Sequence, residues 1–67
     1  MELALERSGG FVRIRARIGD REYEAVGLRS DLPNVLGLLV SQLLRDGQPS
    51  DVVCEAVKRG LEAAQRL

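Results

Sequence analysis

The sequence predicts an α+β fold in which a three-stranded antiparallel β-meander precedes two α-helices. Aliphatic and charged side chains alternate through much of residues 1–29, which is typical of strands with one buried face. Apolar residues then recur every three or four positions through residues 31–46 and 50–66, which is typical of helices. The chain has 67 residues, a length that predicts one domain.

Two glycine turns set the register of the predicted strands. Gly9-Gly10 and Gly19-Asp20 each separate two alternating runs, and two-residue loops that begin with glycine suit tight hairpins. The expected facing pairs are Glu6 with Arg13, Leu5 with Ile14, Leu3 with Ala16, Arg15 with Glu24, Arg17 with Glu22, Ile14 with Ala25 and Ala16 with Tyr23. This register gathers the aliphatic side chains on one face, whereas a slip by one residue would mix the two faces.

The helical half carries start and stop signals. Ser30 or Asp31 can cap the first helix, and Gly47 can end it at a left-handed residue. Ser50 is the expected cap of the second helix. Gly60 lies inside the second helix, where glycine costs about 1 kcal/mol relative to alanine, so we expect another backbone to pack closely there.

The first helix is apolar on most of its sides, which indicates burial on more than one face. Small domains usually need a disulfide, a metal or a partner subunit. One cysteine excludes an intramolecular disulfide and the absence of histidine argues against zinc. We therefore expect a homodimer. The expected interface residues are Leu36, Leu39, Val40, Leu43 and Leu44.

Composition argues against several classes of function. Ten basic and ten acidic residues give a net charge of zero, whereas nucleic-acid-binding domains are usually basic. Without histidine no side chain titrates readily near neutral pH. No plausible base lies near any of the serines, which are Ser8, Ser30, Ser41 and Ser50. We expect neither an enzyme nor a cofactor or metal. No apolar run reaches the length of about 18 residues that a membrane span needs, so the expected location is the cytoplasm.

Arginines occupy every second position of the second predicted strand, at Arg13, Arg15 and Arg17. One interpretation is a solvated sheet face whose charges are paired, because each arginine lies opposite or diagonal to a glutamate. A second interpretation is contact with nucleic acid, which would use free arginines and interleaved aromatic side chains. Phe11 is the one aromatic residue expected on that face. A protein partner that recognises the arginines is the third interpretation.

Residues 26–61 resemble the ribbon-helix-helix family of bacterial repressors and antitoxins, of the CopG and ParD type. The resemblance rests on a strand, a helix, a short turn with Gly47 and the stretch SDVVCEAVKRGL. The second helix of that family commonly opens with a serine, an acidic residue and two aliphatic residues, followed by Glu-Ala-hydrophobic-basic. The matching residues are Ser50, Asp51, Val52, Val53, Glu55, Ala56, Val57 and Arg59.

The resemblance implies a dimeric DNA-binding transcription regulator or antitoxin. A ribbon of Tyr23 to Arg29 would enter the major groove and the start of the second helix would contact phosphate. The implied nucleic-acid-binding residues are Arg29, Ser50 and Asp51, with assistance from Arg13, Arg15 and Arg17. The alternative is a protein-interaction or assembly module that binds no nucleic acid and whose partner docks on the apolar helix.

Overall fold

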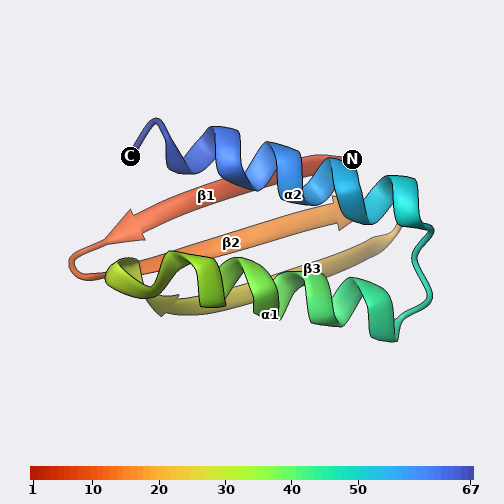
Figure 1. Cartoon of the computed structure of the whole chain (residues 1–67), viewed down its shortest axis with the longest axis horizontal. Coiled ribbons are helices and arrows are strands. Elements are labelled where there is room, and N and C mark those ends of the chain that lie inside the picture. Colours follow the sequence, from red (N-terminus) through yellow and green to blue (C-terminus); the bar gives the residue numbers. More distant parts are fainter.

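A computed structural model of the chain has the predicted order of elements, with three strands before two helices (Figure 1). A single 3₁₀ turn, η1, joins the sheet to the helices. The elements are β1 (Glu2–Ser8), β2 (Phe11–Ile18), β3 (Arg21–Leu28), η1 (Arg29–Asp31), α1 (Leu32–Arg45) and α2 (Ser50–Ala64). No helix is long and apolar enough to pass through a membrane.

The sheet is an antiparallel meander in the order β1-β2-β3, and every facing pair predicted from the two turns is confirmed. Gly9 and Gly19 begin the two turns with φ angles of 59° and 64°. Only glycine adopts this region without steric cost. The turn residues therefore fix a register in which the aliphatic face is continuous across all three strands.

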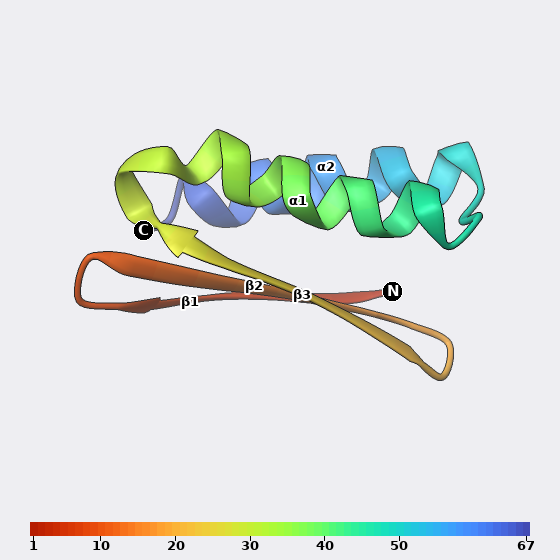
Figure 2. The same cartoon turned by 90° about the horizontal axis from the view of Figure 1, so that it is seen from below.

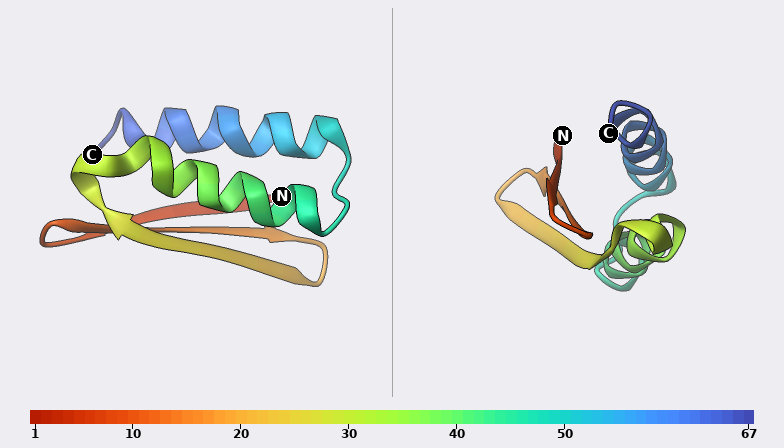
Figure 3. Two further views of the ribbon diagram at one scale, coloured as in Figure 1. Left: turned by 60° about the horizontal axis from the view of Figure 1, so that its bottom comes forward. Right: turned by 90° about the vertical axis from the view of Figure 1, so that its left-hand side faces the viewer.

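Both helices lie on one face of the sheet, so the molecule has two layers (Figures 2 and 3). α1 packs mainly over β3, and α2 packs over β1. The buried core between the layers is aliphatic apart from one tyrosine. Its members are Val12, Ile14, Ala16, Tyr23, Ala25, Val35, Leu39, Leu43 and Ala56.

A polar cluster joins the start of β3 to the end of α1. The hydroxyl of Tyr23 donates to Asp46, and it accepts a hydrogen bond of 2.9 Å from Gln48 Nε2. Arg21 reaches the same carboxylate at 3.1 Å. Gly47 follows Asp46 with φ 77° and ends the helix as predicted. The cluster thereby provides hydrogen-bond partners for the Tyr23 hydroxyl, the one polar side-chain group of the core.

The predicted helix caps are only partly correct. Asp31 precedes α1, but its carboxylate accepts from the Asn34 side chain at 3.0 Å and caps no backbone N–H. Ser50 is the first residue of α2 and Pro49 holds the cap position, without a side-chain hydrogen bond. The proline presets the extended backbone that a cap residue needs, which removes the expected role of Ser50.

Gly60 packs closely, as expected, but against side chains. A Cβ atom at Gly60 would lie 2.7 Å from Leu36 Cδ1 and 3.5 Å from Ile14 Cδ1. The three atoms nearest to that Cβ all belong to these two side chains. The missing side chain therefore makes room for Leu36 between the two helices.

Candidate functional site

The arginines of β2 form ion pairs on the outer face of the sheet, the face that the helices leave open. Arg13 Nε lies 3.1 Å from Glu24, and Arg15 Nη2 lies 2.6 Å from Glu6. Both pairs are diagonal, because the register places Arg13 opposite Glu6 and Arg15 opposite Glu24. The hydrogen bond and the charge of Glu6 raise the pKa of Arg15. Arg17 forms no ion pair.

The diagonal geometry predicts which charges are coupled. In a double-mutant cycle, Arg13→Ala with Glu24→Ala is expected to give a coupling free energy of about 0.2–1 kcal/mol, as for other cross-strand pairs. The matched cycle of Arg13 with Glu6, its facing residue, is expected to give a smaller value, because no ion pair joins these two side chains. Urea unfolding at low and high salt measures both, and the first coupling should shrink with salt. Equal couplings in the two cycles would contradict the diagonal pairing.

The residues implied in DNA binding do not form one surface. Arg29 lies in η1, just before α1, whereas Ser50 and Asp51 lie just beyond the other end of α1. A helix of 14 residues is about 20 Å long, so the two groups sit at opposite ends of the molecule (Figure 1). Arg13 and its neighbours on β2 project from the opposite side of the sheet. Phe11 is exposed on that outer face, where it is the single aromatic side chain.

The strand that the resemblance assigns to the ribbon is already paired within the chain. β3 is bonded to β2 over its whole length, from Arg21 to Leu28. On its other edge, Gln42 of α1 donates to the Glu24 carbonyl at 2.7 Å. Arg29 donates its backbone N–H to Gly10 at 2.8 Å. Pairing of β3 with a second chain would have to displace the Gln42 contact.

Helical spacing and the contact of Leu36 with Gly60 place an apolar surface where the two helices meet. It consists of two stripes at helical spacing, one on each helix, and we call it the interhelical seam. Every member contacts solvent and none is charged, in a chain with ten basic and ten acidic residues. The seam residues are Pro33, Leu36, Val40 and Leu44 of α1 and Val53, Val57, Leu61 and Ala64 of α2.

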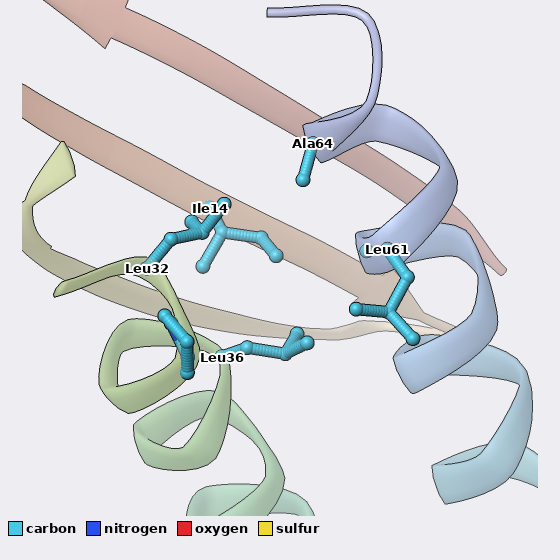
Figure 4. A pocket seen from close by; sticks show the side chains of 7 residues that line it. Ile14, Leu32, Leu36, Leu61 and Ala64 are labelled. Atoms are coloured by element: carbon cyan, nitrogen blue, oxygen red, sulfur yellow. The ribbon is translucent and has the colours of Figure 1, made fainter. Parts of the chain in front are cut away.

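A cavity of about 200 Å³ opens at one end of the seam, between the start of α1 and the end of α2 (Figure 4). Ile14 forms its floor, and Leu36 and Leu61 approach it from the two helices. The side chain of Leu61 is 53% exposed at the rim. The remaining lining residues are Leu32, Pro33, Gly60 and Ala64. Its walls are almost wholly apolar, so an apolar group is the occupant that they favour.

The interface residues expected from the sequence divide into two groups. Leu39 and Leu43 are fully buried in the core of the chain itself, so neither is accessible to a partner. Leu36 and Val40 are partly exposed and Leu44 is 62% exposed, and these three belong to the seam. Sequence reasoning missed the contribution of α2 to the seam. The signal for it was the apolar stripe of that helix, which is too wide to be buried by contact with the sheet alone.

No group of three or more Cys, Asp and Glu side chains could hold a metal ion. Cys54 is exposed, and no buried side-chain polar atom lacks a partner. The cavity is lined by hydrocarbon. The seam and its cavity can therefore bind apolar groups.

Comparison of the chain with protein-family models, curated proteins and solved structures finds no match. The ribbon-helix-helix resemblance therefore stays a prediction that rests on the residues quoted for it.

Proposed function

We propose that the protein is a non-enzymatic interaction module that assembles with another polypeptide through the interhelical seam. The single observation that carries this proposal is the seam, an uncharged surface with an apolar cavity at one end. Exposed apolar patches of this kind on small proteins mark interaction surfaces. The seam also contains two exposed leucines, Leu44 and Leu61, and burial of such a side chain contributes about 1.5–3 kcal/mol.

The outer sheet face supports a DNA-binding function less well. Two of its three β2 arginines are already paired with glutamates, and the net charge of the chain is zero. Neutralisation of phosphates supplies most non-specific affinity for DNA. The register places four glutamates but only three arginines on this face, so the face supplies little of that affinity.

Site-specific photocrosslinking in the source cells tests the proposal. A benzophenone side chain replaces Ser41, which is exposed beside the seam, and in a matched variant it replaces Glu22 on the outer sheet face. After irradiation, covalent adducts are identified by mass spectrometry. We expect protein adducts from position 41 and few from position 22.

Adducts formed only from position 22, or adducts with nucleic acid from that position, would contradict the proposal. Purified protein and labelled duplex DNA provide the second measurement, by fluorescence anisotropy at rising salt. We expect no binding at physiological salt. Binding that weakens linearly with the logarithm of salt would instead favour the regulator hypothesis.

A further inference from the structure

We infer that the occupant of the seam is a second copy of this chain, and that Leu44 of each copy inserts into the cavity of the other. This inference rests on the proposed function, since it names the partner of the same surface. The two copies would be related by a two-fold axis that crosses the middle of the seam. Their helical layers would then stack as an antiparallel four-helix bundle between two outer sheets.

The chain carries both halves of the contact. Leu44 is the most exposed large apolar side chain, at 62%, and it lies in the last turn of α1. The cavity lies at the other end of the seam. A two-fold axis perpendicular to the helices exchanges these ends, because symmetric contacts use one patch on both copies. The axis therefore brings Leu44 of the second copy over the cavity.

The size and polarity of the cavity fit this side chain. A dry cavity of about 150 Å³ lined by aliphatic residues is enough for a benzene molecule. The cavity beside Leu36 and Leu61 measures about 200 Å³ and can therefore accept the four carbons of a leucine side chain. One leucine side chain can enter the cavity and places no polar atom against its walls.

A stable complex would have to bury the whole helical face of each copy. Each partner in a stable complex buries about 800 Å² of accessible surface. The principal extents of the molecule are 32 × 19 × 19 Å, so the helical face projects onto a rectangle of about 600 Å², and side chains make its accessible area larger. A second copy matches this face in size. A short peptide or a small ligand in the cavity would leave most of the seam exposed.

Electrostatics and stability allow self-association. The net charge is zero, so no net repulsion separates two copies. The chain buries ten of its 67 residues and has neither a disulfide nor a metal cluster to support so small a core. Domains of this size are often stabilised by oligomerisation. Dimerisation through the seam would extend the core across both copies.

Sedimentation equilibrium of the purified protein at 1–100 µM gives the first test. We expect a dimer, and we expect Leu44→Glu to raise its dissociation constant by at least tenfold. Leu38→Glu is the matched control, because Leu38 is a similarly exposed leucine of α1, at 54%. It lies one turn before Gln42, on the side of α1 that faces β3, and therefore outside the seam. Circular dichroism confirms that both variants fold.

Disulfide trapping gives the second test, in a Cys54→Ser background. Leu44→Cys combined with Ala64→Cys is expected to form a covalent dimer under mild oxidation. Within one chain the two positions lie at opposite ends of the helical layer, beyond the Cα separation of about 7 Å that a disulfide allows. Each single-cysteine variant is expected to remain unlinked.

The outcomes separate this inference from the proposed function. A monomer at 100 µM, equal dissociation by both glutamate variants, or a dimer that the paired cysteines do not trap would each overturn the inference. A monomer that still yields adducts with a different protein from position 41 would leave the proposed function standing. A monomer without such adducts would contradict both the inference and the proposed function.

Discussion

Leu39→Ala is expected to lower the free energy of unfolding by about 2–5 kcal/mol, the range for truncation of a fully buried leucine. Leu39 has no exposed surface and lies at the centre of α1, against the sheet. A domain of this length has a total stability of about 3–10 kcal/mol. The variant should therefore be partly or wholly unfolded at 25 °C, as urea titration followed by circular dichroism would show.

The neighbouring leucine provides the control for that measurement. Leu38→Ala changes the same residue type in the same helical turn, but the side chain of Leu38 is 54% exposed. Substitutions at such surface positions usually change stability by less than about 0.5 kcal/mol. Similar losses for the two variants would contradict the placement of Leu39 in the core.

The fold was predictable because two independent signals in the sequence agree. The turn glycines at Gly9 and Gly19 fixed the register of the strands, and the alternation of charge confirmed which side chains face out. Charge pairing was less predictable. Facing residues follow from the register, but the choice of the diagonal partner depends on side-chain rotamers, as Arg13 and Arg15 show.

The candidate site was only partly predictable, for a physical reason. An excess of apolar residues on α1 indicated a second buried face, but periodicity alone cannot divide them between the core and an interface. Leu39 and Leu43 are buried in the core, whereas Leu44 is exposed. The cavity depends on how the start of α1 and the end of α2 approach each other in three dimensions. The sequence pattern of neither helix predicts how closely the two helices approach.

At Gly27 and Gly60 an added Cβ would lie at similar distances from its nearest neighbour, but we expect substitution by alanine to have different effects at the two positions. A Cβ at Gly27 would lie 2.6 Å from Val35 Cγ2, and one at Gly60 would lie 2.7 Å from Leu36 Cδ1. Both contacts are too short for the native arrangement. The decisive difference is how far each neighbouring side chain can move.

Val35 is β-branched and nearly fully buried, and valine in a helix has one strongly preferred rotamer. Gly27→Ala should therefore cost about 1–3 kcal/mol by overpacking. Leu36 is long, partly exposed and borders the cavity, so its end can turn into open space. Gly60→Ala gains about 1 kcal/mol of helix propensity, and its net effect should be near zero or stabilising. Thermal unfolding of both variants, at a concentration where each is monomeric, compares them directly, and an equal loss would show that Leu36 is as tightly held as Val35.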